Sequence, residues 1–414
     1  FKQKTAYEIM PSLVGSEMCI RDSTMSLLKL ALRNLLGARL RTWLNVIVLS
    51  FAFFAIIGLQ GVYEGMNRQA MQAEIDAEYG GGQFWHPEYN PYDPLTLQQA
   101  HGSPPEKLQA MIDNGLATPI LILQGTAYPQ GRFYPVLLKG IDPNQKILTM
   151  PSFVLKNHEA ELPALIGERM ADSLKLKVGD TVTLRWRDVN GTFDAREASI
   201  VHVMRTTVQA IDQGQIWLPL PRLQQLTGMN KEATLVVLDK DVKNIPENTG
   251  WVFKDQKTLL RDIQELVKTK TVGSSILYII LMLLAMLAIF DTQVLSIWRR
   301  RKEIGTLMAL GMTRWSVVKL FTLEGALHGI LATLVGAIYG LPLLTLFARK
   351  GWGMPEAVDS YGFAIGERIY PIYSGGLILG TALLVLIVTT LVSFLPTRRI
   401  AKMKPTEALR GRFQ

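Results

Sequence analysis

The sequence predicts a multi-pass α-helical membrane protein with four transmembrane helices and a large mixed α/β domain inserted between the first and second helices. Three observations predict this fold class. Four runs of the chain lack charged residues over the length of a membrane span, basic residues flank these runs, and a long charged segment separates the first run from the others. About 20 apolar residues in a helix cross a hydrocarbon core of about 30 Å.

The four uncharged runs are the expected transmembrane helices. A helix buried in the core of a soluble protein can also be apolar, but four long runs with basic flanks favour membrane spans. We expect the helices over residues 42–63, about 271–297, 325–348 and about 373–396.

Basic residues gather at one end of each span and set the expected orientation. Lys29 and Arg33 precede the first span, Arg299–Lys302 follow the second, and further cations follow the fourth. The positive-inside rule then places both termini and the loop after the second span in the cytoplasm. Residues 64–270 hold 22 Lys and Arg against 25 Asp and Glu. The formal net charge of +9 therefore reflects topology and contact with anionic membrane lipid, and we expect no nucleic-acid partner.

The first 24 residues are expected to be an artefactual leader. Ser12–Asp22, SLVGSEMCIRD, resembles the translation of a common transposase-based sequencing adapter, and a genuine N-terminal extension is the alternative. Met25 is then the expected first native residue. Cys19, the only cysteine, lies in this leader, so the sequence offers no disulfide, thiol nucleophile or cysteine-ligated metal.

Residues 25–41 are expected to form a cytoplasmic amphipathic helix. Leu28, Leu32 and Leu35 alternate with Lys29 and Arg33 at helical spacing. Such a helix lies on the inner leaflet with its basic face toward lipid headgroups. Packing of the apolar face against protein is the alternative.

The segment 64–270 is expected to form a mixed α/β domain on the far side of the membrane. Thr181–Arg187 alternates apolar and polar residues, which predicts a half-buried strand. Asn190-Gly191 predicts a type I′ hairpin turn, and residues 198–204 return as the partner strand. Other expected elements are helices at 167–174 and 221–226, a turn at 177–180, a strand at 233–238, an irregular segment at 80–105, and a small β-rich subdomain near 160–210.

Catalytic and nucleotide-binding motifs are missing from this sequence. It has no GxxxxGK[ST] loop to cradle phosphates, no HExxH pair and no GxSxG. The five histidines are scattered without ligand spacing. We therefore expect a chain that is not an enzyme and holds no cofactor of its own. If it belongs to an ATP-driven machine, ATP and magnesium must be bound by a separate partner.

The loop between the second and third spans carries the most informative pattern. Glu303–Leu310 has helical periodicity with Ile304, Leu307 and Met308 on one face, and Gly311 can supply the left-handed residue that ends a helix. We expect a short cytoplasmic helix at about 301–312. It can serve as a docking knob for a soluble partner or, alternatively, as an anchor on the inner leaflet.

This loop resembles the FtsX domain of MacB/FtsX-like ABC-transporter permeases. In that family a segment R-x-x-E-I-G-x-x-x-A-L-G precedes a glutamate at the head of the next span. The C-terminal stretches 396–401 and 405–410, and the earlier stretches 27–37 and 167–184, resemble other parts of the same family. Resemblance covers nearly all of residues 25–410, and the C-terminal third is the most specific. The matching positions are Arg300, Glu303, Ile304, Gly305, Ala309, Leu310, Gly311 and Glu324.

The resemblance implies a transport subunit that relays the motion of a separate cytoplasmic ABC ATPase to a periplasmic domain, to extrude or release lipoproteins or small amphiphiles. It makes 64–270 a MacB-like periplasmic core domain and 271–414 an FtsX-like permease domain. A second permease copy, identical or sister, and a periplasmic adaptor or chaperone are the other implied partners. The implied ATPase-coupling residues are Arg300, Glu303, Ile304, Gly305, Leu307, Met308, Ala309, Leu310 and Gly311.

Four residues in the spans are candidates for packing or polar roles. Gly336 and Gly340 form a GxxxG pattern that permits close helix approach. Glu324 matches the family glutamate. Asp291 departs from the family, which more often has an uncharged polar residue there, and it is expected to pair with basic residues at the inner interface or to be protonated.

Two other functions remain open. An FtsX-type transmembrane regulator of cell-wall hydrolases is the first, although the outer domain is usually smaller there. A membrane receptor is the second and less favoured, because no cytoplasmic signalling domain is evident in the sequence.

Overall fold

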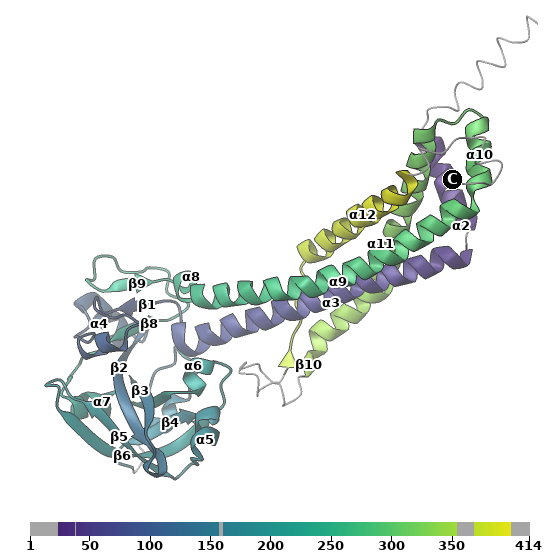
Figure 1. The fold of residues 1–414 in the computed structure, drawn as a ribbon. Coiled ribbons are helices and arrows are strands. Elements are labelled where there is room, and N and C mark those ends of the chain that lie inside the picture. The colour runs from purple at the N-terminus through teal and green to yellow at the C-terminus, as the bar shows by residue number, and fades with distance from the viewer. Residues whose placement is uncertain (1–23, 38, 157–159, 354–367, 399–414) are drawn as a thin grey trace, which may run out of the picture. The chain divides into compact units, whose positions relative to one another are not determined.

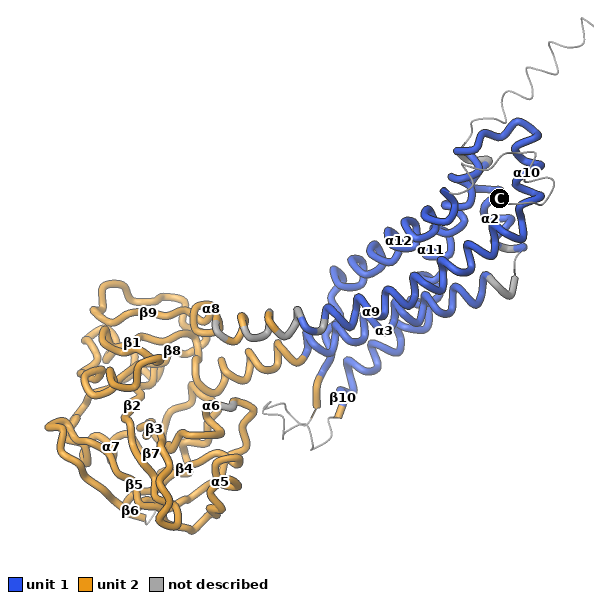
Figure 2. Tube along the Cα trace, viewed as in Figure 1, with its two compact units in different colours: residues 1–65, 270–352, 370–414 blue, residues 66–269, 353–369 orange. Residues whose placement is uncertain are grey.

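The computed structural model describes residues 24–37, 39–156, 160–353 and 368–398. The expected leader, apart from its last residue, and the C-terminal stretch 405–410 lie outside the described residues. The chain divides into two compact units, coloured separately in Figure 2. The helical unit comprises 1–65, 270–352 and 370–414, and the α/β unit comprises 66–269 and 353–369.

Four helices are long and apolar enough to cross a membrane. Among the described residues these candidate spans are 42–79, 275–299, 314–350 and 375–397, so the four predicted spans are confirmed as apolar helices. The third span belongs to one continuous helix that begins at Arg314. The helices are α2 (Thr24–Gly37), α3 (Arg39–Glu74), α9 (Arg261–Arg299), α10 (Arg301–Ala309), α11 (Arg314–Lys350) and α12 (Gly375–Thr397) (Figure 1).

Small residues let α11 approach its neighbours closely. A Cβ atom added at Gly325 would lie 1.9 Å from Ser393 Oγ of α12, and one at Gly329 would lie 2.4 Å from Thr389 Oγ1. Neither position therefore has room for a side chain. A common apolar cluster of α3, α9, α11 and α12 continues this packing through Val46, Leu49, Ala285, Ile289, Ala332 and Val392.

Helix α2 packs against protein on one face and stays exposed on the other. Ala31 and Leu35 are buried, whereas Leu28 and Leu32 are exposed. Thr42 at the start of α3 donates a hydrogen bond to the Leu35 carbonyl at 2.8 Å. Part of the apolar face of the predicted amphipathic helix therefore packs on protein, and its expected position on the inner leaflet stays a prediction.

The α/β unit contains a nine-stranded sheet. Its strands are β1 (Gln83–Trp85), β2 (Ala117–Tyr128), β3 (Tyr134–Ile141), β4 (Pro163–Gly167), β5 (Thr181–Arg187), β6 (Phe193–Met204), β7 (Gln215–Pro219), β8 (Leu235–Leu238) and β9 (Val252–Lys254). Its helical turns are η1 (Ile75–Tyr79), η2 (Pro94–Gln98), α4 (Glu106–Asp113), η3 (Pro129–Gly131), η4 (Ser152–Leu155), α5 (Glu168–Leu174), α6 (Gln209–Asp212), α7 (Leu220–Thr227) and α8 (Gln256–Leu259). A two-residue pair, β10 (Trp352–Gly353) with β11 (Arg368–Ile369), forms a second sheet.

Six of these strands close into a barrel. The order β3-β7-β4-β6-β5-β2 is completed by an antiparallel pairing of β2 with β3, while β8, β1 and β9 extend the sheet from β2. Closure removes exposed edges from the six strands. All six contribute to one buried cluster, which includes Leu123, Leu138, Ile166, Trp186, Ile200 and Leu218.

Several predicted elements of this unit are present, and three need correction. The β-rich part is not confined to 160–210, because β2 and β3 supply two strands of the barrel. The partner strand begins at Phe193 rather than 198. The irregular segment at 80–105 contains the short strand β1 and the turn η2.

The hairpin between β5 and β6 exists, but its turn is not type I′. Type I′ requires positive φ at both central residues, and here only Gly191 has it, at 77°. The Asp188 carboxylate accepts hydrogen bonds from the backbone N–H groups of Asn190 and Thr192 at 2.9 and 2.7 Å. These bonds form an Asx arrangement, which stabilises a turn that needs no positive φ at Asn190, ahead of the glycine.

Helix α3 ends in the π-helical turn η1, which is fixed to the sheet. Lys139 of β3 forms an ion pair with Glu78 at 2.5 Å. The backbone N–H of Thr149 donates to the Asp76 carbonyl at 2.8 Å. These contacts hold the end of α3 as an integral part of the α/β unit.

Replacing Gly325 with alanine should lower the thermal midpoint of the detergent-solubilised protein, because overpacking of this kind costs about 1–3 kcal/mol. Gly380→Ala on α12 is the matched control, since nothing lies within 4 Å of its added Cβ. Adding Ser393→Gly to the Gly325 variant should restore most of the midpoint. Equal midpoints for the two single variants would contradict the close α11–α12 contact.

Candidate functional site

The short helix α10 lies between α9 and α11 and is closed at its end by a defined cap. Gly311 has a φ of 99°, as the sequence predicts for the residue that ends this helix. The N–H of Met312 donates to the Leu307 carbonyl at 3.1 Å, and the N–H of Gly311 donates to the Met308 carbonyl at 3.2 Å. This pair of bonds is a Schellman motif. The chain then restarts at Thr313, whose hydroxyl accepts from the Ser316 N–H at the head of α11.

One face of α10 is buried against the neighbouring helices. Ile304 and Met308 pack with Val317 and Phe321 of α11 and with Ile297 of α9. Gly305 is also buried. These contacts make α10 part of the helical unit rather than a free loop.

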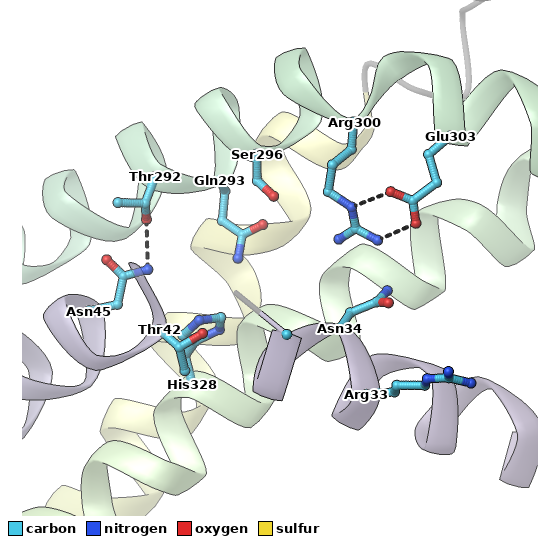
Figure 3. Close-up of a pocket in the computed structure, with 11 residues that line it drawn as sticks. Arg33, Asn34, Thr42, Asn45, Thr292, Gln293, Ser296, Arg300, Glu303 and His328 are labelled. Atoms are coloured by element: carbon cyan, nitrogen blue, oxygen red, sulfur yellow. Dashed lines mark hydrogen bonds and ion pairs between the residues drawn. The ribbon is translucent and has the colours of Figure 1, made fainter. Parts of the chain in front are cut away.

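A single guanidinium joins α10 to α11. Arg300, the residue before α10, donates from Nε and Nη2 to the two Glu303 carboxylate oxygens, each at 2.7 Å (Figure 3). Its Nη1 donates to both oxygens of Glu324 on α11, at 3.1 and 3.0 Å. The Glu324 side chain is only 7% exposed, and Arg300 is the cation that compensates its charge.

Arg300 and Glu303 both lie outside the candidate spans, and the hydrogen bonds between them favour the charged form of each side chain. Hydrogen bonds from Arg300 hold the pKa of the Glu303 carboxyl below its ordinary value, against the opposing effect of partial burial. Hydrogen bonds to Glu303 likewise raise the pKa of Arg300. The Arg300 guanidinium also lies 4.8 Å from the ring centroid of Phe321. Planar, bidentate contacts of this kind are specific to arginine.

A polar cavity of about 400 Å³ lies beside Arg300. Figure 3 shows the Asn45 amide on α3 directed at Thr292 on α9, and the hydrogen bond between them is 3.0 Å long. The His328 ring on α11 lies 2.7 Å from the Glu324 carbonyl through Nδ1. The cavity lining is Arg33, Asn34, Gly37, Thr42, Asn45, Thr292, Gln293, Ser296, Arg300, Glu303 and His328.

Sequence reasoning missed Asn45, Thr292 and Gln293 as members of this site. Their position inside apolar runs could have identified them, because polar side chains in such runs usually face protein or a cavity rather than lipid.

Within the described part of the chain, no group of three His, Cys, Asp or Glu residues is placed to hold a metal ion.

The predicted coupling residues differ in how far their side chains are exposed. Ile304, Gly305 and Met308 are buried and support α10 from beneath, while Leu307 is half-buried. The exposed residues are Glu303, Ala309, Leu310 and Gly311. The predicted face of Ile304, Leu307 and Met308 is therefore the inner face, and a partner would meet the opposite one.

The remaining candidate residues lie apart from this network. Added Cβ atoms at Gly336 and Gly340 would lie 2.9 Å from Phe53 and 3.1 Å from Phe54, both on α3, so this GxxxG pattern lies against α3. Asp291 is exposed on α9, and among the described residues no cation pairs with it. Its expected pairing with basic residues is not seen within that part of the chain.

Comparisons with known proteins agree on one family. Residues 275–405 match the FtsX-like permease C-terminal family. The lipoprotein-releasing system transmembrane protein LolC of Neisseria meningitidis is 25% identical over 281 residues, covering 60% of this chain and 65% of LolC.

Two further relatives point the same way. An uncharacterized ABC transporter permease, MJ1507 of Methanocaldococcus jannaschii, is 23% identical over 269 residues, covering 60% of this chain and 62% of that protein. The macrolide export ATP-binding/permease protein MacB of Vibrio parahaemolyticus is 27% identical over 155 residues, 37% of this chain and 21% of MacB. The chain thus spans slightly less than two thirds of the length of LolC and MJ1507 in these alignments.

Replacing Arg300 with alanine should destabilise the helical unit by about 3–5 kcal/mol, because it leaves the buried Glu324 carboxylate without its partner. Unfolding in mixed micelles by titration with dodecyl sulfate measures the change. The control is Arg205→Ala, which removes a pair with Glu168 between largely exposed side chains and should cost less than about 1 kcal/mol. A double variant, Arg300→Met with Glu324→Leu, should recover most of the stability; no recovery would argue against charge compensation.

The stability that Glu303 contributes should depend on pH. Its pKa in the folded protein lies below the ordinary value of 4.5, so the contribution is complete above that value and is lost as the pH falls through the folded pKa. The thermal midpoints of the unmodified protein and Glu303→Gln should differ by a constant amount at neutral pH and converge below about pH 4.5. A difference that persists or grows at low pH would exclude this ion pair as its source.

Proposed function

The chain is a permease of the FtsX/MacB/LolC family of ABC transporters, and we propose that it relays the motion of a separate ATPase through α10 into its membrane-spanning helices. The family implies an ABC ATPase as partner, and its permease subunits are not enzymes themselves. Four apolar helices make the chain a multi-pass membrane protein.

The Arg300 network carries this proposal. Arg300 binds Glu303 of α10 and Glu324 of α11 at once, and Ile304 and Met308 pack on α11 beneath it. A push on α10 therefore cannot be absorbed by bending of a loose loop. It moves α9 and α11 with it, because the two ion pairs of Arg300 and the apolar contacts would have to break otherwise.

The outward face of α10 supplies the surface that the ATPase would grip. Lys302, Thr306, Ala309 and Leu310 are exposed along this face. Leu310 is 81% exposed, although it is a large apolar side chain. An apolar side chain that projects from a rigid helix suits insertion into a groove of a soluble partner.

The topology and the cargo complete the proposal. Both termini and α10 lie in the cytoplasm, the membrane is the bacterial inner membrane, and the α/β unit is the periplasmic domain between the first two spans. A second permease copy, identical or sister, pairs with this chain, and a periplasmic adaptor or chaperone receives the cargo. Similarity to LolC and MacB supports a lipoprotein or a small amphiphile as that cargo.

Replacing Leu310 with serine should weaken association with the partner ATPase at least about tenfold, because the apolar side chain at the centre of the contact is lost. The folded chain should be unaffected, since the side chain is almost fully exposed. Val178→Ser is the matched control, an apolar residue 61% exposed on a turn of the α/β unit. The measurement is the permease concentration needed for half-maximal change in ATP hydrolysis.

If Leu310→Ser and Val178→Ser behave alike, the ATPase does not grip this face of α10. The side of the membrane on which residue 310 lies provides a second check. In sealed vesicles, a cysteine introduced at residue 310 should react with a membrane-impermeant reagent only from the side on which the ATPase binds.

A further inference from the structure

A groove of about 640 Å³ crosses the outer surface of the barrel in the α/β unit. Its floor is formed by residues of β2, β5 and β6, and one wall by the turn η2. The side chains that matter for its chemistry are Leu95, Tyr128, Phe133, Arg185, Arg187 and Phe193. The volume falls within the range of about 300–1,000 Å³ that is common for small-molecule sites.

Two arginines meet on one aromatic ring in this groove. Arg185 and Arg187 are alternate residues of β5, so their side chains leave the same face of the sheet. Phe193 is the residue directly opposite Arg187 on β6. The guanidinium carbons lie 3.9 Å (Arg185) and 4.7 Å (Arg187) from the Phe193 ring centroid. Both guanidiniums thus lie against one ring, and their cation–π attraction to it offsets part of their mutual repulsion.

Neither positive charge is compensated within the described part of the chain. No carboxylate there pairs with Arg185 or Arg187, and Arg185 has only a long contact of 3.5 Å to the Tyr128 hydroxyl. Asp188 also lines the groove and forms no ion pair with either arginine, so two positive charges stand against one negative charge there. The groove therefore presents a cationic centre.

Exposed apolar side chains flank that cationic centre. Leu95 is 73% exposed and Phe133 is 69% exposed. Phe133 is held edge-on to Tyr128, with ring centroids 6.3 Å apart. The groove therefore combines exposed apolar surface with a cationic centre, which is the combination that an amphiphile requires.

We propose that this groove binds a single-chain amphiphile with a phosphate headgroup. The two guanidiniums bind the phosphate oxygens through their paired N–H donors. The alkyl chain lies along Phe133 and Leu95, where it removes their apolar surface from water. This inference rests on the proposed function in one respect, since it gives a headgroup to the small amphiphile proposed as cargo. The site lies wholly within the α/β unit, so its binding can be tested apart from the relay through α10.

The test uses the full chain in phosphatidylcholine nanodiscs and radiolabelled decyl phosphate in equilibrium dialysis. Empty nanodiscs measure partition of the probe into lipid. We expect saturable binding beyond that background, which Arg185→Gln with Arg187→Gln should reduce at least about tenfold. The matched control is Arg205→Gln with Arg222→Gln, the same change of charge on the same unit outside the groove, and it should leave binding unchanged.

Two comparisons separate the headgroup from the chain. Decanol, which has the same chain without charge, and inorganic phosphate, which has the charge without the chain, should each bind much more weakly than decyl phosphate. Decanoate should also bind less tightly, because it offers fewer oxygens to two guanidiniums. A Phe133→Ala variant should weaken binding of decyl phosphate and leave that of inorganic phosphate unchanged.

Three results would overturn the proposal. These are binding no greater than to empty nanodiscs, equal loss in the two double variants, or equal binding of decanol and decyl phosphate. The thermal midpoint of the Arg185/Arg187 double variant must match that of the unmodified protein, and Arg185→Lys with Arg187→Lys gives a second test. The lysine pair keeps the charge but not the planar donors, so it should retain only part of the affinity.

Discussion

The guanidinium of Arg300 joins α9, α10 and α11, and the arrangement of the helical unit depends on this junction. It lies where α9 ends, binds Glu303 in the first turn of α10, and reaches Glu324 on α11. Glu324 is buried, so it can stay charged there only beside a cation. Because this compensation requires a fixed geometry, the network specifies how three helices meet rather than simply adding stability.

Helix α11 is the element that every neighbour in the helical unit uses. Its first turns carry the apolar contacts to α10, its glycines at 325 and 329 admit α12, and those at 336 and 340 lie against α3. A helix with small residues on several sides has no spare space on those sides. If α10 is driven by a partner, as proposed, these contacts would pass a displacement at the Arg300 end on to α3 and α12.

Much of this fold could be read from the sequence because its elements are set by local patterns. The uncharged runs, the alternation at Thr181–Arg187 and the helix stop at Gly311 each depend on nearby residues alone. Barrel closure could not be read, since it needs β2 to pair with β5 and β3 to pair with β7 across long stretches of chain. The turn at Asn190-Gly191 was wrong in type because Asp188, outside the dipeptide, decides it. Periodicity also could not show that α9 and α11 cover the apolar face of α10, because it identifies an apolar face without saying what packs on it.

The shortness of α10 has a practical consequence for anyone who wishes to block it. Nine residues are fewer than the roughly 12–15 that an isolated helix needs in water, so this helix exists only because its neighbours and its cap hold it. A synthetic peptide copied from this stretch would therefore be largely unstructured and a poor competitor. An effective inhibitor would need a covalent staple or a scaffold that reproduces the support given by α11.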